Sequence, residues 1–289
     1  MLAVSQVSPL RKKMIEDMQL HGLSENTQDL YARAVSQLSK YVQRSPDKVT
    51  EEDLREYFLY LTNEKKAARS TTTVALCGIK FFYENTLRRD WPTLRLVRPA
   101  PEHKLPVILS PDEVRRVLAE VNLPVYRVCL TTIYSCGLRL MEGARLQVAD
   151  VDSERMMLHI HGGKGKRDRY VALPEPTLIR LREFWKTHRS PDWLFPARSA
   201  KHPGTPITGK SLQRAFYRAL KKSGITKKAH VHTLRHAYAT HLMERGVHLR
   251  LIQETLGHRN PGTTAIYTHL TQSVRDTITA PLNELMKDL

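Results

Sequence analysis

The sequence predicts a mainly α-helical protein of two domains, with a small β-hairpin or sheet in the second domain. Apolar residues recur at helical spacing through most of the 289 residues, two short β-prone runs flank a glycine-rich turn, and one stretch is rich in proline. At roughly 150 residues per domain, the length also favours two domains. We expect an all-α domain at 1–92, a linker at 93–107 and a mixed α/β domain at 108–289.

Three helices are predicted in the first domain. Ser24 is placed to cap a helix whose apolar stripe reaches Val42, and Thr50 begins a capping-box pattern ahead of a second amphipathic helix. A third helix is predicted over 71–87. The prolines that follow keep a chain extended and interrupt helices, so we place the linker among them: Pro92, Pro99, Pro101 and Pro106.

The second domain mixes helices with a hairpin. Ser110, followed by a proline and then an acidic residue at the third helical position, is a strong helix start. Another helix is predicted over 125–134. The runs 156–161 and 169–173 flank a glycine- and lysine-rich turn, which predicts a β-hairpin. From Thr208 onward the patterns are helical to the end of the chain.

The charge of the chain points to a polyanionic partner. It has 46 Lys+Arg against 29 Asp+Glu, a net charge of +17, and residues 198–250 hold twelve of the basic residues and one acid. Nucleic acid is the leading candidate for this partner, and the concentrated basic charge favours contact with DNA over a merely solvated basic face. The candidate DNA-binding residues lie on the outer face of the helix predicted from Thr208 and in the glycine-rich turn: Lys210, Arg214, Tyr217, Arg218, Lys221, Lys166 and Arg167.

Cysteine usage and hydropathy place the protein in the cytoplasm. Cys77, Cys129 and Cys136 fit neither a disulfide framework nor a paired CxxC metal pattern, which favours a reducing compartment. No apolar run approaches the roughly 20 residues of a membrane span, and the N-terminus has no signal-peptide core. We expect a soluble protein with no membrane partner.

Two histidines have the spacing of a zinc pair. His232 and His236 lie at i and i+4, but the residues between them are Thr-Leu-Arg, and Arg235 raises the electrostatic cost of a divalent cation. We therefore expect no metal and no cofactor. His236 and His241 are expected to pack as structural histidines.

Five fragments carry residues suited to phosphodiester chemistry. Taken singly, each fragment has an ordinary, non-catalytic interpretation. Glu142 at i+3 would simply hold Arg139, the lysine of the glycine-rich turn would be solvated, and the tyrosine would lie at the edge of a core. As a set they fit one anionic substrate, because two planar guanidinium groups match the two non-bridging oxygens and replace a Mg²⁺ ion. Histidines and a lysine move protons, and nearby cations favour the phenolate of a nucleophilic tyrosine. The candidate catalytic residues are Arg139, Lys164, His232, Arg235, His258 and Tyr267.

These fragments resemble the tyrosine recombinase, or phage integrase, family in order and spacing: GLRLMEG (137–143), GGKGKRDR (162–169), HTLRHAYATHL (232–242) and LGHRNPGTTAIYTH (256–269). The phrase GLSENTQDLYARAVSQLSKYV (22–42) resembles the family's N-terminal core-binding, SAM-like domain. LSPDEVRRVL (109–118) resembles the start of its catalytic domain. The resemblance covers nearly the whole chain and implies that domain pair.

The resemblance also implies residue roles. Tyr267 would attack the scissile phosphate, giving a 3′-phosphotyrosyl link and a free 5′-hydroxyl, with Arg139 and Arg235 stabilising the transition state. His232 would be the general base, Lys164 the general acid and His258 a hydrogen-bond donor. Two neighbours remain open: Lys166 competes with Lys164, and His269 flanks the nucleophile. The energy stored in the phosphotyrosyl bond removes the need for ATP or metal.

The resemblance further implies a clamp of two domains around DNA and a tetramer that exchanges strands through a Holliday junction. The segment 273–289 would be a helix that docks on a neighbouring protomer, or one that packs within its own chain. Integration and excision of a mobile element is the expected role. The alternatives are a Xer-like resolvase of chromosome or plasmid dimers, a monomeric type IB topoisomerase-like enzyme, and a catalytically idle DNA-binding protein.

Overall fold

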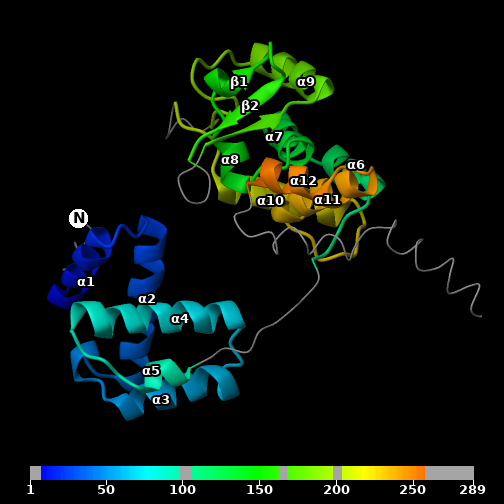
Figure 1. Ribbon diagram of the computed structural model, residues 1–289. Helices are drawn as coiled ribbons and strands as arrows, with labels where there is room; N and C mark the ends of the chain where they lie inside the picture. Colours follow the sequence, from blue (N-terminus) through cyan, green and yellow to red (C-terminus); the bar gives the residue numbers. More distant parts are fainter. Residues whose placement is uncertain (1–7, 98–105, 163–167, 198–203, 258–289) are drawn as a thin grey trace, which may run out of the picture. The chain divides into compact units, whose positions relative to one another are not determined.

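A computed structural model describes residues 8–97, 106–162, 168–197 and 204–257 (Figure 1). The chain divides into two compact units, Met1–Lys104 and Leu105–Leu289. Each unit has its own buried apolar core. Within the described residues, no helix is both long and apolar enough to cross a membrane.

The first unit is built only from helices. Ser24 and Thr50 cap the second and third of them, as the sequence predicts, and Thr50 forms a complete capping box with Asp53. The third and fourth helices each continue into one π-helical turn, Tyr60–Glu64 and Phe82–Thr86. The α-helices are α1 (Pro9–Leu20), α2 (Glu25–Val42), α3 (Glu51–Leu59), α4 (Arg69–Phe81) and α5 (Thr93–Leu96).

The core of the first unit centres on the packing of α2 against α4. Gly78 permits this approach, because a Cβ at that position would lie 2.9 Å from the Cα of Tyr31. The short helix α5 lies within the segment that the sequence predicts as a linker. It contributes the buried Leu94 to this core.

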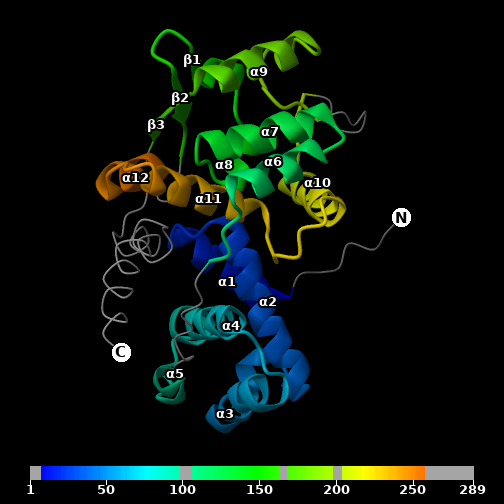
Figure 2. The ribbon, with the colours of Figure 1, turned by 90° about the vertical axis from the view of Figure 1, so that its right-hand side faces the viewer.

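In the second unit, several helices pack around one central helix. Helix α7 (Pro124–Ser135) packs against five other helices and lies between α9 and α11 in both views (Figures 1 and 2). Ser110 caps α6 with the predicted capping box, and Thr208 caps α10. The remaining α-helices are α6 (Pro111–Ala119), α8 (Leu140–Ala144), α9 (Glu175–Lys186), α10 (Gly209–Lys222), α11 (Val231–Glu244) and α12 (Leu249–Leu256).

A three-stranded antiparallel sheet completes the second unit. The predicted hairpin is present as β2 (Met157–Ile160) and β3 (Arg169–Ala172), in the register that pairs Leu158 with Val171. The strand β1 (Val151–Asp152), which the sequence did not predict, adds to the other edge of β2. The described residues are thus mainly helical with one small sheet, which confirms the predicted fold class.

The two faces of the hairpin carry different chemistry. Leu158, Ile160 and Val171 are buried on the inner face. Because side chains alternate along a strand, Arg169 shares that inner face, while Asp168 and Tyr170 lie on the outer one. The inner face leads to the candidate active site.

Candidate active site

The turn between α7 and α8 positions Arg139. Gly137 ends α7 with a φ of +62°, and a Cβ there would lie 2.5 Å from the ring of Tyr238. Only glycine meets both conditions. The next residue, Leu138, is fully buried and anchors the turn. Arg139 therefore occupies the N-cap position of α8, with its side chain 23% exposed.

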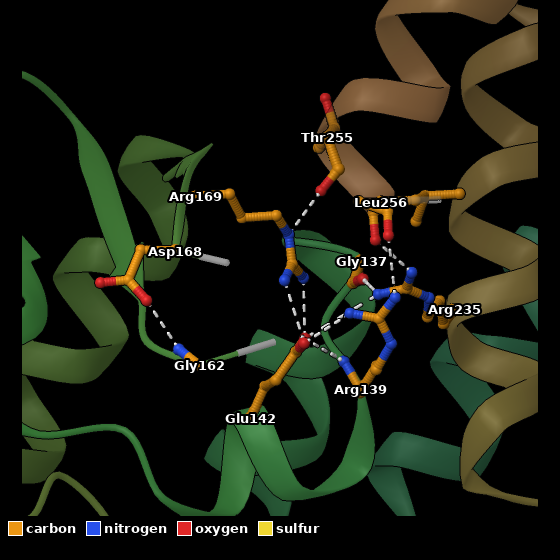
Figure 3. Close-up of polar contacts among 10 residues, drawn as sticks. Gly137, Arg139, Glu142, Gly162, Asp168, Arg169, Arg235, Thr255 and Leu256 are labelled. Carbon is orange, nitrogen blue, oxygen red and sulfur yellow. Dashed lines mark hydrogen bonds and ion pairs between the residues drawn. The ribbon is translucent and has the colours of Figure 1, made fainter. Parts of the chain in front are cut away.

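Glu142 gathers three guanidinium groups around one carboxylate (Figure 3). It accepts hydrogen bonds from the backbone N–H of Arg139 at 2.8 Å and from Nη1 of the same residue at 2.7 Å. Arg169 donates to both carboxylate oxygens, from Nη1 at 2.9 Å and Nη2 at 2.7 Å. Nη1 of Arg235 lies 3.9 Å from Oε2. The three arginines carry two more positive charges than Glu142 neutralises, so the cluster attracts anions.

The same three arginines hold the C-terminal end of α12. The carbonyl of Thr255 accepts from Nε of Arg169 at 3.0 Å, that of Leu256 from Nη2 of Arg235, and that of Gly257 from Nη2 of Arg139 at 3.1 Å. The last carbonyls of a helix have no partner within it and carry its negative dipole end, so guanidinium groups stabilise them. Residue 257 is thereby held beside Arg139.

Arg235 is the most deeply buried charged residue in the described part of the site, at 1% exposed. It lies on α11, and its Nη1 donates to the carbonyl of Gly137 at 2.7 Å. The side chain thus ties α11 to the turn before α8 as well as to the end of α12. Four segments far apart in the sequence meet at these arginines.

The arginines keep Glu142 ionised. Burial by itself raises the pKa of Glu142, but the hydrogen bonds and charge of Arg169, followed by those of Arg139, outweigh it and lower this pKa to about 2. Glu142 is consequently a carboxylate at neutral pH. The interpretation of Glu142 as the partner that holds Arg139 is confirmed.

His232 lies in the first turn of α11, with one side packed against the chain and the other open to solvent. Desolvation by the surrounding chain, then the charge of Arg235, then those of His230 and Arg139 lower the pKa of His232 to about 4. The ring is therefore neutral at pH 7 and able to accept a proton. Its neighbour in the predicted zinc-like pair, His236, meets it edge to face with ring centroids 4.7 Å apart.

His241, which the sequence predicts to be structural, is 4% exposed. Its Nδ1 lies 2.9 Å from the hydroxyl of Tyr134 on α7. Burial lowers the pKa of His241, so the ring packs in its neutral form. This assignment is confirmed.

Helix α10 carries the predicted basic face. Tyr217 is 67% exposed, and the basic residues around it are exposed as well, whereas Leu212 and Phe216 are buried on the opposite face. Arg214 and Arg218 also line a hollow of about 430 Å³ against the segment 120–126. The basic residues of this face make no ion pair with any residue in the described ranges. They are Lys210, Arg214, Arg218 and Lys221.

Other basic residues of this region have structural partners. Lys222 pairs with Glu120 at 2.6 Å, and Lys227 pairs with Glu113 at 2.6 Å. These two lysines tie α10 and the loop after it to α6. The basic residues of 198–250 therefore include two kinds: residues on an open face of α10, and lysines that form ion pairs with α6 and the residue that follows it.

Several predicted residues lie outside the described part of the chain: Lys164, Lys166, Arg167, His258, Tyr267, His269 and the segment 273–289. The structure brings together Arg139, Arg235 and Glu142, with His232 on the same helix as Arg235. Arg169 belongs to this cluster but was not singled out from the sequence. Its only signal there is its place at the end of the GGKGKRDR fragment, because its partner Glu142 lies 27 residues away.

Comparisons with known proteins agree with the sequence resemblance. The profile described as the phage integrase family matches residues 108–273, and that of the phage integrase N-terminal SAM-like domain matches residues 10–93. A putative integrase/recombinase of Sinorhizobium fredii, y4qK, is 43% identical over 262 residues, which are 90% of this chain and 84% of that protein. The tyrosine recombinase XerC of Halalkalibacterium halodurans is 31% identical over 233 residues, 75% of this chain and 76% of that one.

Solved structures share the fold. The XerH site-specific recombinase bound to a palindromic difH substrate matches with a TM-score of 0.69 and 22% identity, covering 96% of this chain and 91% of that one. A lambda integrase dimer bound to a COC′ core site matches with a TM-score of 0.73 and 14% identity, covering 89% and 93%. With a family profile across more than half of its length and a relative 43% identical across nine-tenths of it, the chain belongs to the phage integrase family of tyrosine recombinases.

Proposed function

We propose that this protein is a site-specific DNA recombinase that cleaves and rejoins DNA strands through a covalent phosphotyrosyl intermediate on Tyr267. The observation that carries the proposal is the arginine cluster around Glu142. Its surplus of two positive charges suits a phosphodiester, and its arginines hold the end of α12, directly before the sequence fragment that contains His258 and Tyr267.

The reaction is a pair of transesterifications. The Tyr267 oxygen attacks phosphorus and forms a P–O bond, while the bond to the 5′-oxygen breaks and that oxygen takes a proton. His232, which is neutral at pH 7, accepts the proton of the phenol, and Lys164 supplies the proton of the leaving group. A 5′-hydroxyl then attacks the phosphotyrosyl bond and releases the tyrosine.

Arg139 and Arg235 stabilise the charge that develops on the non-bridging oxygens, and His258 donates a further hydrogen bond. Arg139 is the more accessible of the two arginines, and Arg235 contributes its charge from a fully buried position. Fixed guanidinium groups of this kind replace a metal ion, and the number of phosphoester bonds is conserved, so the chemistry needs neither ATP nor a redox cofactor.

We propose that double-stranded DNA lies against the open face of α10, whose basic residues make no ion pairs among the described residues. Lys166 and Arg167 would extend this contact. Exchange of strands between two DNA sites through a Holliday junction needs a tetramer, and the segment 273–289 is our candidate for the contact between protomers.

Integration and excision of a mobile element is the role we favour, since the relatives at 43% identity are named putative integrase/recombinase. Resolution of chromosome or plasmid dimers is the second candidate, supported by the XerC relatives at 31–34% identity. The two roles differ in the DNA site. A mobile-element recombinase acts on sequences that flank its own gene, whereas a resolvase acts on one site per replicon.

A covalent adduct on a denaturing gel tests the chemistry. Wild type, Tyr267→Phe and the control Tyr170→Phe, whose phenol is 55% exposed on β3, are incubated with nicked duplexes from the DNA that flanks the gene, with and without EDTA. We expect an adduct from wild type and the control but not from Tyr267→Phe. An adduct in Tyr267→Phe would remove this nucleophile, and an adduct that EDTA abolishes would overturn the metal-free mechanism.

A further inference from the structure

The outer face of the hairpin holds a cluster of nitrogen and oxygen donors that the recombinase mechanism does not use. His159 and His161 lie two residues apart on and just after β2, and Asp168 directly precedes β3. One donor atom from each lies within 4.8 Å of the others. Asp168 and Arg169 point away from each other (Figure 3), so Asp168 takes no part in the arginine cluster.

The donor separations match those of a tetrahedral metal site. Nε2 of His159 lies 3.4 Å from Oδ2 of Asp168, and Nδ1 of His161 lies 3.5 Å from the same oxygen. Two ligands bound to one Zn²⁺ at about 2.0–2.1 Å with a tetrahedral angle are about 3.3–3.4 Å apart. Two of the three donor separations match this value, and the third, between the two histidine nitrogens, is within 4.8 Å.

A buried carboxylate orients His161. Asp150 is 5% exposed, and its Oδ1 accepts a hydrogen bond from Nε2 of His161 at 2.8 Å. The other ring nitrogen, Nδ1, lies 3.5 Å from the Asp168 oxygen, so both atoms are placed to ligate one ion. A carboxylate behind a ligating histidine is the usual support of a metal-bound imidazole.

The other two donors are also held in place. The ring of His159 stacks on Tyr170 with centroids 4.6 Å apart and an interplanar angle of 11°. Oδ1 of Asp168 accepts from the backbone N–H of Gly162 at 2.8 Å, which leaves Oδ2 directed at the histidines. A cavity of about 580 Å³, lined by both histidines and also by Glu142, opens beside the two rings and has room for water.

We propose that His159, His161 and Asp168 bind one divalent transition-metal ion, with Zn²⁺ as the best match, and that the ion joins β2 to the start of β3. Two imidazoles and one carboxylate suit Zn²⁺ and Co²⁺ far better than Mg²⁺ or Ca²⁺, which prefer oxygen ligands. The ion does not take part in strand cleavage. It cross-links the two ends of the turn whose sequence contains Lys164.

Co²⁺ titration of the untagged, metal-free full chain without DNA tests the proposal. We expect one equivalent to bind with the visible absorption of four-coordinate Co²⁺, and Zn²⁺ to displace it. His161→Gln and Asp168→Asn should each weaken binding by about 100-fold or more, and Asp150→Asn, which changes only the support of His161, by about 10- to 100-fold. His21→Gln, an exposed histidine of the other unit, is the matched control and should bind as wild type does.

Two results would overturn the proposal. One is a wild-type protein that binds no stoichiometric Co²⁺ or Zn²⁺, which would make the cluster a set of histidine–aspartate ion pairs. The other is binding that survives His161→Gln and Asp168→Asn but disappears in His232→Gln. Thermal unfolding without metal shows whether each variant is folded, and His159→Gln replaces any that is not. Because no DNA is present, failure here leaves the proposed recombination chemistry untouched.

Discussion

Replacing Glu142 with glutamine removes the one negative charge around which Arg139, Arg169 and Arg235 are arranged. The side chain of Glu142 is only 8% exposed, so solvent screens the loss weakly. A pKa that falls from 4.5 to about 2 on folding corresponds to about 3 kcal/mol of stability at neutral pH. Breaking a buried ion pair on one side costs about 3–5 kcal/mol, which agrees with that figure.

The cost should depend on pH in a defined way. A carboxylate whose folded pKa is lowered stabilises the protein above its unfolded pKa, here 4.5, and loses this contribution as the pH falls toward 2. Wild type should therefore lose stability over that interval, whereas Glu142→Gln should not lose this part. The difference between the two proteins is expected to be largest at pH 7 and to shrink below pH 4.5.

Urea unfolding followed by tryptophan fluorescence measures the difference. The chain has three tryptophans, and in a Trp91→Phe background the remaining two, Trp185 and Trp193, report on the second unit. The control is Glu254→Gln, which breaks an exposed i, i+4 pair with Arg250 and should cost about 0.3–0.5 kcal/mol.

A cost of Glu142→Gln no larger than that of Glu254→Gln at pH 7 would contradict this role of the carboxylate. A difference from wild type that is the same at pH 7 and at pH 3 would contradict it equally. Either result would mean that the arginines are held by the backbone carbonyls without help from the carboxylate.

Four further predictions follow from single contacts. Gly78→Ala should destabilise the first unit by about 1–2 kcal/mol, because the clash with the α2 backbone outweighs the gain in helix propensity; thermal unfolding measures this. Gly137→Ala should cost the second unit about 3 kcal/mol in urea unfolding, from positive φ and overpacking together. In an NMR titration of the DNA-free protein, His232 should remain neutral down to about pH 5. Arg214→Gln should lower the salt slope of DNA binding by about 0.9, while Lys227→Gln, which breaks an internal pair, should leave the slope unchanged.

Elements with local signals were predictable from the sequence. Ser24, Thr50 and Ser110 each cap the helix that the sequence assigns to them, because a capping hydrogen bond joins residues three apart and its partners are visible in one short window. The hairpin was predictable because its two β-prone runs and the glycine-rich turn between them follow one another in the sequence. Strand β1 was not, because two residues show no periodicity and pair only through the register of β2.

Charge and motif spacing were also enough to point to DNA and to select Arg139, Arg235 and His232 as candidates. They did not distinguish the basic residues on the open face of α10 from those that form ion pairs with α6. Lys221 and Lys222 are adjacent in the sequence, yet Lys222 pairs with Glu120 while Lys221 makes no ion pair among the described residues. That distinction depends on which way each side chain leaves the helix and on what lies opposite.

The helical fold class, the helix starts and the residue types of a phosphodiester site can all be predicted from the sequence alone. How those residues are held depends on contacts between distant segments. Arg169 joins the cluster, and one carboxylate together with the carbonyls of Thr255, Leu256 and Gly257 orients three guanidinium groups. His159, His161 and Asp168 likewise meet on the outer face of the hairpin only in the folded chain. The physical reason is that caps and periodicities act over a few residues. Ion pairs and donor clusters form between segments that only folding brings together.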